Sequence, residues 1–201
     1  MYLYCTVLEE SKPELCSKIT VPGKRITTAR WGPFNRHIYT GAEDGEVAMW
    51  DWQTGEKIQS SREHSAQIHD LQWAADQTHF ITASKDNTAK IFDAVDLMPL
   101  KTYVTDRPVN SASISPLKEH VILGGGQEAA QVTTTSVRAG KFEVRFYHKI
   151  LEEEIGRVKG HFGPINTVAF HPDGKSFSSG GEDGFVRVHH FDSDYFSFQG
   201  E

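Results

Sequence analysis

Apolar and polar positions alternate with a period of two over short stretches of the chain. Leu71 and Trp73 belong to one such stretch, and Val168 and Phe170 belong to another. Turns bound these stretches: residues 171–174, His-Pro-Asp-Gly, combine a proline that presets φ with a glycine that accepts positive φ. A period of two between turns is typical of half-buried β-strands, and no helical periodicity of useful length occurs. The pattern therefore predicts an all-β protein.

The predicted strands belong to a repeat. Its clearest mark is a small hydroxyl residue four positions before an aspartate, found as Thr40 and Asp44, Thr82 and Asp86, and Ser179 and Asp183. The first two copies are 42 residues apart, and two copies have a histidine, His64 or His161, 22 residues before the aspartate. Four-stranded units of 40–45 residues with these marks are the signature of a β-propeller blade. Asp-Gly pairs after the hydroxyl residue predict tight hairpin turns at residues 44–45 and 183–184.

The repeat predicts one incomplete propeller domain over residues 1–201. We expect a half blade followed by four blades, with the boundaries 1–21, 22–63, 64–104, 105–160 and 161–201. In the degenerate blade at 105–160, Thr105 and Gln127 replace the histidine and aspartate, and an insertion is expected near residues 128–141. A ring of seven blades needs roughly 290 residues. We therefore expect about four and a half of seven blades, in a fragment or truncated form of a longer protein.

The repeat resembles that of the WD40 family over essentially the whole chain. In that family a His, a Ser or Thr, an Asp and a Trp of one blade form a hydrogen-bonded tetrad. By position, the resemblance implies three partial tetrads, namely Thr40, Asp44 and Trp50; His64, Thr82 and Asp86; and His161, Ser179 and Asp183. Pro22 stands at the missing histidine position, and Phe92 and His189 stand at the missing tryptophan positions. Because a buried donor without a partner costs about 1–3 kcal/mol, we expect these blades to depend more on apolar packing.

Composition excludes several classes of protein. The chain has 21 Lys and Arg against 27 Asp and Glu, a formal net charge of −6, which disfavours nucleic-acid binding by bulk electrostatics. Residues 138–159 hold six basic residues against four Glu, and this net charge of +2 is too small to argue for direct RNA contact. No apolar run approaches the roughly 18 residues that span a bilayer, and the residues from Met1 to Glu10 do not predict a secretory signal. Two cysteines and no glycosylation sequon favour a reducing, cytosolic setting.

No group of residues predicts catalysis, a metal site or a cofactor site. Residues 124–126 are three glycines, but the Lys-Ser/Thr of a phosphate loop does not follow them. His189 and His190 are adjacent on a strand, so their side chains point to opposite faces and do not chelate one ion. We therefore expect no enzymatic activity and no cofactor. A propeller of this kind binds other molecules through its faces and rim.

Two aspartates are candidates for such binding. Asp76 lies in a predicted turn, Asp93 follows the aromatic residue of the same repeat, and neither is needed for a tetrad. They could anchor a basic partner segment beside an apolar contact at Ile91. The alternative is that they are ordinary solvated loop carboxylates.

Several segments are more particular than a generic repeat. They are residues 82–90, 107–111, 123–128, 132–136, 140–143, 152–158, 160–166 and 179–184. From about Ile26 to Glu201 the chain resembles the family of subunit i of eukaryotic translation initiation factor 3, whose members are seven-bladed propellers. The resemblance implies that Asp76, Ile91 and Asp93 belong to a surface for subunit b.

The same resemblance implies a non-catalytic scaffold in the cytoplasm. Such a scaffold binds subunits b and g and supports 40S ribosomal subunit recruitment and scanning during translation initiation. It works in a complex of different subunits, not as a homo-oligomer, and has no membrane partner. Two rival hypotheses stay open at this point. One is another WD40 adaptor, for example in receptor-kinase signalling, and the other is an enzyme of unrecognised type.

Overall fold

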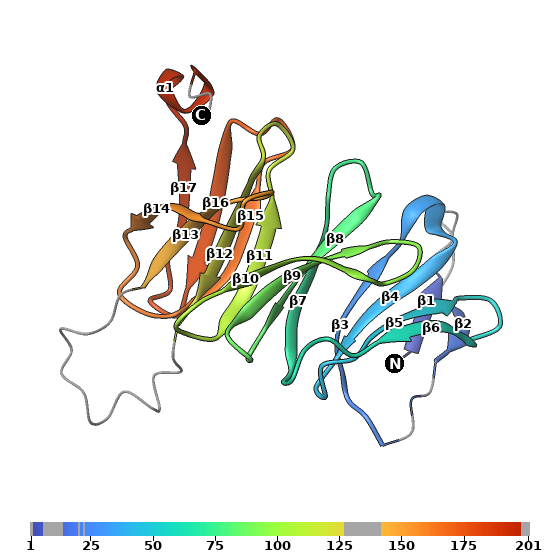
Figure 1. Ribbon diagram of the computed structural model, residues 1–201. Helices are drawn as coiled ribbons and strands as arrows, with labels where there is room; N and C mark the ends of the chain where they lie inside the picture. The colour runs from blue at the N-terminus through green and yellow to red at the C-terminus, as the bar shows by residue number, and fades with distance from the viewer. Residues whose placement is uncertain (1, 6–13, 20, 22, 127–141, 198–201) are drawn as a thin grey trace, which may run out of the picture.

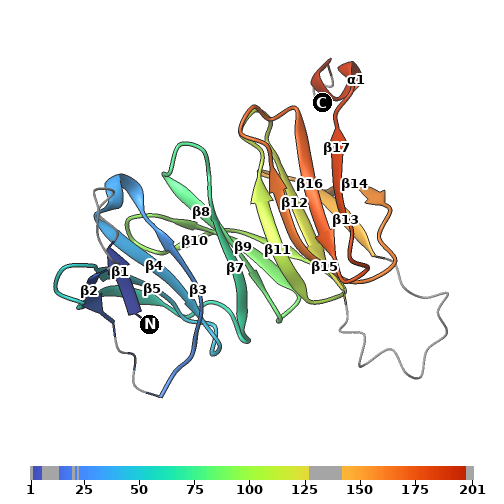
Figure 2. The ribbon, with the colours of Figure 1, turned by 180° about the vertical axis from the view of Figure 1, so that it is seen from behind.

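The computed structural model describes residues 2–5, 14–19, 21, 23–126 and 142–197. Within these residues the chain forms antiparallel β-sheets that follow one another in chain order as a curved row, seen from two sides in Figures 1 and 2. The helical segments of the same residues are a 3-10 turn, Pro33–Asn35, and a five-residue helix, α1, Ser193–Ser197. The predicted all-β class is confirmed.

Strands pair in sequential order within each sheet, so each strand lies beside the strand that precedes it in the chain. The first sheet contains β3 (Ile26–Trp31), β4 (His37–Ala42), β5 (Val47–Asp51) and β6 (Lys57–Ser61). The second sheet contains β7 (Ile68–Trp73), β8 (His79–Ser84), β9 (Thr88–Asp93) and β10 (Pro99–Val104). The third sheet contains β11 (Val109–Ile114), β12 (His120–Gly125), β13 (Glu143–His148) and β14 (Glu154–Lys159).

Shorter units flank these three sheets. The last sheet has three strands among the described residues, β15 (Ile165–Phe170), β16 (Ser176–Gly181) and β17 (Val186–His190). A two-stranded pair, β1 (Tyr2–Cys5) and β2 (Glu14–Lys18), lies at the other end of the row. The insertion expected near residues 128–141 lies outside the described residues. The blade boundaries expected after residues 21, 63, 104 and 160 stay a prediction.

The sheets repeat one another in detail. In the four sheets that follow the β1–β2 pair, the register of the first strand shifts at the same place, between Ile26 and Thr28, Ile68 and Asp70, Val109 and Ser111, and Ile165 and Thr167. The two Asp-Gly turns lie in the hairpins that join β4 to β5 and β16 to β17. Gly45 and Gly184 have positive φ, 84° and 78°, which a glycine adopts without steric cost. The predicted hairpins are confirmed.

The apolar core lies between the faces of successive sheets. Tyr39 and Met49 of the first sheet pack with Leu71 and Phe80 of the second sheet. A cluster between the second and third sheets includes Ile81, Ile91, Tyr103, Leu123 and Tyr147, and one between the third and last sheets includes Ile122, Val144, Val168 and Phe177. The inner strands β3, β7, β11 and β15 also contact each other in series. Antiparallel sheets packed face to face in this way are the architecture of a WD40-type β-propeller, which confirms the predicted fold.

Candidate functional site

A chain of hydrogen bonds links the second sheet to the loop that precedes it. The imidazole of His64 lies with Nε2 2.7 Å from the Thr82 hydroxyl and Nδ1 2.9 Å from the Asp86 carboxylate. Asp86 also accepts from the backbone N–H of Ser65 and from the hydroxyl of Thr88. His64, Thr82 and Asp86 therefore meet as their spacing implies, although Thr88 was not anticipated.

The charge of the Asp86 carboxylate determines which nitrogen of His64 donates in this hydrogen-bond network. Burial alone would raise the pKa of Asp86, but hydrogen bonds from His64 and Thr88 outweigh burial and hold the pKa far below its ordinary value. The carboxylate is therefore ionised near neutral pH, and Nδ1 of His64 carries the proton that it donates. Nε2 lies beside the Thr82 hydroxyl, whose oxygen is also 3.3 Å from the carbonyl of Lys90.

The first sheet contains the hydrogen bond between Trp and Thr of the tetrad, which the second sheet lacks. The indole Nε1 of Trp50 donates to the Thr40 hydroxyl oxygen across 2.8 Å, and this hydroxyl donates to the carbonyl of Ala48. Asp44 does not join this pair; its carboxylate lies 2.8 Å from Nζ of Lys24. Pro22, at the missing histidine position, lies outside the described residues. Lys24 thus supplies the positive partner of Asp44.

The last sheet repeats the arrangement of the second. His161 Nε2 lies 2.8 Å from the Ser179 hydroxyl, and Nδ1 lies 3.0 Å from the Asp183 carboxylate. The guanidinium of Arg187 adds a second donor to Asp183 at 3.0 Å. Burial opposes ionisation of Asp183, but the donors that surround it outweigh burial and lower its pKa. His189, at the tryptophan position, stacks on Phe177 instead.

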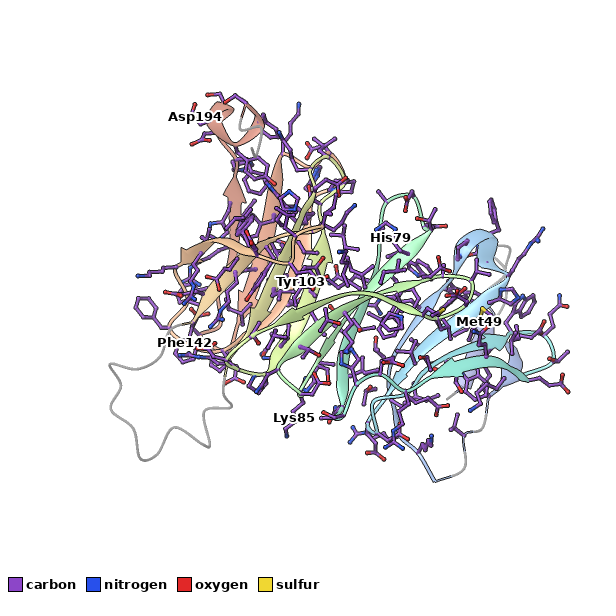
Figure 3. All side chains as sticks on the ribbon, in the orientation of Figure 1. Met49, His79, Lys85, Tyr103, Phe142 and Asp194 are labelled. Carbon is purple, nitrogen blue, oxygen red and sulfur yellow. The ribbon has the colours of Figure 1, made fainter. Side chains whose placement is uncertain are left out.

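Asp76 and Asp93 are neighbours of His79, the first residue of β8, which Figure 3 labels. Asp93 is the cross-strand partner of His79, and the Asp76 carboxylate lies 3.6 Å from its Nδ1. Both carboxylates are oriented by their own turns: Asp76 accepts from the N–H and hydroxyl of Thr78, and Asp93 accepts from the N–H of Val95. The Asp76 side chain is 59% exposed. Asp76 is therefore at the surface, and Asp93 is half-buried beside His79.

The electrostatics of this edge favour a basic partner. Burial alone would raise the pKa of Asp76, but the hydrogen bonds from Thr78 outweigh burial and lower it. Burial lowers the pKa of His79 and outweighs the opposite effect of Asp76, so this imidazole is neutral near physiological pH. The negative charge of Asp76 is therefore not neutralised by His79.

The chain matches the model of the EIF3I family over residues 5–201. The chain belongs to this family. It is 60% identical over 177 residues to eukaryotic translation initiation factor 3 subunit I of Nematostella vectensis, which covers 88% of this chain and 55% of that protein. Against the same subunit of Taeniopygia guttata it is 58% identical over 194 residues, covering 96% of this chain and 59% of that protein. The chain thus spans between half and two thirds of the length of these relatives.

The resemblance inferred from the sequence segments is therefore confirmed at the level of the EIF3I family. One residue of the site is not where the resemblance implied. Ile91 is only 2% exposed and packs with Tyr103 and Tyr147 between the second and third sheets. A direct contact between Ile91 and a partner is not available at the surface of the folded EIF3I-family chain. Its packing instead fixes the end of β9, where Asp93 lies.

Sequence reasoning also missed the neighbours of the two aspartates. A cavity of about 160 Å³ lies beside Asp76, between the β7–β8 turn and the β11–β12 turn. His79, Glu119 and Lys149 line it, and the last two form an ion pair of 2.7 Å. His79 belongs to the second sheet, whereas Glu119 and Lys149 lie in turns of the third, so no spacing within one repeat groups all three. The equivalence of the two turns in successive repeats is the signal that would have found Glu119.

The described residues of this EIF3I-family chain contain no cluster of three or more His, Cys, Asp or Glu side chains arranged to hold a metal ion. Among the same residues, no helix is long and apolar enough to cross a membrane.

Proposed function

We propose that this EIF3I-family chain is a non-catalytic scaffold subunit of the eukaryotic translation initiation factor 3 complex, acting in translation initiation in the cytoplasm. The observation that carries the proposal is the family match over residues 5–201, almost the whole chain. The identity of 57% over 196 residues to the same subunit of Xenopus tropicalis supports it. In this proposal the sheets serve to hold binding surfaces in fixed relative positions.

The proposed surface for subunit b is the edge with Asp76 and Asp93. Two carboxylates at one edge, each held in place by its own turn, suit a helical segment whose basic residues meet them. His79 between them is neutral, so it leaves both charges available to a partner. Ile91 contributes by packing beneath the edge, not by direct contact.

The proposal extends to subunit g and, through the complex, to the 40S ribosomal subunit and scanning. This part rests on the family resemblance and on no particular contact in the chain. It includes no membrane partner and no homo-oligomer. Direct contact with RNA is not part of it, because the basic excess of residues 138–159 is small.

The test is a double charge reversal, Asp76→Lys with Asp93→Lys, in the full chain. We expect loss of binding to purified subunit b, because the reversal of both charges repels a basic segment. The circular dichroism spectrum should stay unchanged, because Asp76 is exposed and Asp93 is at the end of its strand. Full binding by the double variant would exclude this edge as the interface. Failure of the unmodified chain to bind subunit b, or any other subunit of the factor, would overturn the scaffold proposal itself.

The repeat supplies a matched control. Asp51 and Asp173 occupy the same turn positions in the first and last sheets that Asp93 and Asp76 occupy in the second. Asp51 accepts from backbone N–H groups of its turn, as Asp93 does, and Asp173 accepts from the N–H of Lys175. The double variant Asp51→Lys with Asp173→Lys changes the net charge equally, so it should bind subunit b normally.

A further inference from the structure

Two turns of the third sheet present apolar side chains beside the cavity that borders Asp76. Leu117 of the β11–β12 turn is 57% exposed, and Ile150 and Leu151 of the β13–β14 turn are 54% and 59% exposed. Leu117 lines the cavity together with Lys149, the residue before Ile150. Leu117, Ile150 and Leu151 are named the apolar ridge below.

The β13–β14 turn does not itself require an apolar pair. In the β5–β6 turn of the first sheet, the Asp51 carboxylate accepts from the N–H groups of residues 53–54, Gln-Thr, both across 2.8 Å. In the β13–β14 turn, Nδ1 of His148 accepts from the N–H groups of residues 150–151, Ile-Leu, both across 3.2 Å. The two turns make the same backbone contacts with a polar pair in one and an apolar pair in the other. The exposed apolar pair is therefore not a requirement of the turn.

Contacts from the second sheet hold the β13–β14 turn in place. The hydroxyl of Tyr103 donates to the carbonyl of Lys149, and Nζ of Lys101 donates to the carbonyl of Ile150, both across 2.7 Å. The Glu119 carboxylate lies 2.7 Å from Nζ of Lys149, which joins this turn to the β11–β12 turn. The apolar ridge is thus fixed before a partner arrives, and such preorganisation lowers the entropic cost of binding.

Leu117 is positioned by its own turn and by the last sheet. It is the third residue after β11, as Asp76 is the third residue after β7, so the two have equivalent places in neighbouring turns. Both line the same cavity. A Cβ on Gly174 of the β15–β16 turn would lie 2.5 Å from Cγ of Leu117, so the glycine leaves the space that this side chain needs. A carboxylate and an apolar side chain therefore face one cavity from two sheets.

The charges beside the apolar ridge favour a basic partner. Asp76 and Glu153 are exposed, and within the described part of the chain no lysine or arginine forms an ion pair with either carboxylate. The amine of Lys149 is paired with Glu119, and the amine of Lys118 donates to a carbonyl of α1. Basic side chains of a partner could therefore pair with both free carboxylates.

We propose that the apolar ridge is the apolar half of the surface whose charged half is Asp76 and Asp93, and that an amphipathic helix of subunit b occupies both halves. The ridge lies in turns, which offer no ladder of backbone groups to an added strand, so a partner contacts it through side chains. A helix presents apolar residues along one face with basic residues beside them, which matches the ridge and its neighbouring carboxylates. The ridge supplies the exposed apolar contact that the buried Ile91 does not. This inference rests on the proposed function.

The test measures the affinity of the full chain for purified subunit b by isothermal titration calorimetry. The double variant Ile150→Gln with Leu151→Thr copies residues 53–54, so the turn should keep its hydrogen bonds and the circular dichroism spectrum should not change. We expect the affinity to fall roughly tenfold to a hundredfold, because apolar anchors at the centre of an interface carry much of its binding energy. The loss should be the same at about 0.1 M and about 0.5 M salt, since mobile ions do not screen apolar contacts.

Single variants at one turn position supply the matched control. Phe34 is the third residue after β3 and is 89% exposed, so it has the place of Leu117 in the first sheet, away from the cavity. Leu117→Ser should weaken binding of subunit b, whereas Phe34→Ser should change the affinity less than about twofold. If circular dichroism shows that the double variant does not fold, this pair of single variants carries the test. An equal loss in both single variants would contradict the assignment of the ridge.

The outcomes separate the two levels of the proposal. If the unmodified chain binds subunit b and the variants Ile150→Gln with Leu151→Thr and Leu117→Ser bind it equally well, the apolar ridge is excluded and the proposed function stands. If the unmodified chain does not bind subunit b, the proposed surface for subunit b and the inference drawn from it are both overturned.

Discussion

The first and second sheets keep opposite halves of the same hydrogen-bond pattern. In the first sheet the indole of Trp50 donates to Thr40, and the described residues place no imidazole beside them. In the second sheet the imidazole of His64 joins Thr82 to Asp86, and a phenyl ring occupies the position of the indole. In both sheets a buried threonine hydroxyl lies at the centre.

The difference shows how an incomplete pattern stays stable. The Thr40 hydroxyl donates to the carbonyl of Ala48, two strand positions before Trp50. The Thr82 hydroxyl lies within hydrogen-bond distance of both His64 Nε2 and the equivalent carbonyl, that of Lys90. In the first sheet the aspartate without an imidazole binds Lys24. A buried polar group without a partner costs about 1–3 kcal/mol, whereas a pair removed as a whole leaves nothing unsatisfied. The sheets therefore differ in which partners they have, but not in whether the central polar groups have partners.

The largest effect should come from the second sheet. His64→Leu removes the imidazole and leaves the Asp86 carboxylate, whose side chain is 7% exposed, without its main donor. We expect a loss of about 3 kcal/mol in the free energy of unfolding, because a buried ionised carboxylate loses a hydrogen-bond donor and keeps only those of Ser65 and Thr88. Urea unfolding of the full chain measures this loss.

The double variant His64→Leu with Asp86→Leu tests whether the buried carboxylate causes this loss. It removes the Asp86 carboxylate together with the imidazole, so it should recover part of the lost stability. A loss below about 1 kcal/mol for His64→Leu alone would contradict the importance given to this pair.

An intermediate effect should come from the hydroxyl of the first sheet. Thr40→Val leaves the buried indole N–H of Trp50 without its acceptor, which should lower the free energy of unfolding by about 1–3 kcal/mol. In a Trp50→Phe background no indole donor remains, and Thr40→Val should cost less there. A double-mutant cycle measured by urea unfolding gives this coupling. Equal costs in the two backgrounds would mean that the hydrogen bond contributes nothing.

Much of the fold could be predicted because its signals are local. The position of Thr40 four residues before Asp44 predicts a hairpin, and apolar residues at every second position, Leu71 and Trp73, predict a strand. Residues less than about ten positions apart carry this information, so it survives without knowledge of the packing. The sheet-to-sheet repeat then follows from repetition of the same local pattern.

The candidate site was less predictable because it depends on packing between repeats. Ile91 was expected at a partner surface, but β9 is a central strand whose faces are both covered, so Ile91 and Phe92 are both buried. Lys24 lies on a different segment from Asp44, and no motif joins them. Glu119 reaches the neighbourhood of Asp76 only because the second and third sheets pack together. Each of these depends on which sheet lies beside which.

The smallest effect should come from the lysine that replaces the imidazole in the first sheet. Lys24→Met removes the partner of Asp44, but Lys24 is 34% exposed, and the Asp44 carboxylate is 21% exposed. Water can therefore solvate the carboxylate that remains, unlike Asp86 in the second sheet. We expect a loss below about 1 kcal/mol at low salt, measured by urea unfolding, and a smaller loss at 1 M salt because mobile ions screen an exposed pair. A loss as large as that of His64→Leu would mean that the two sheets depend equally on the cationic or donor partner of their aspartate, and that solvent exposure does not distinguish them.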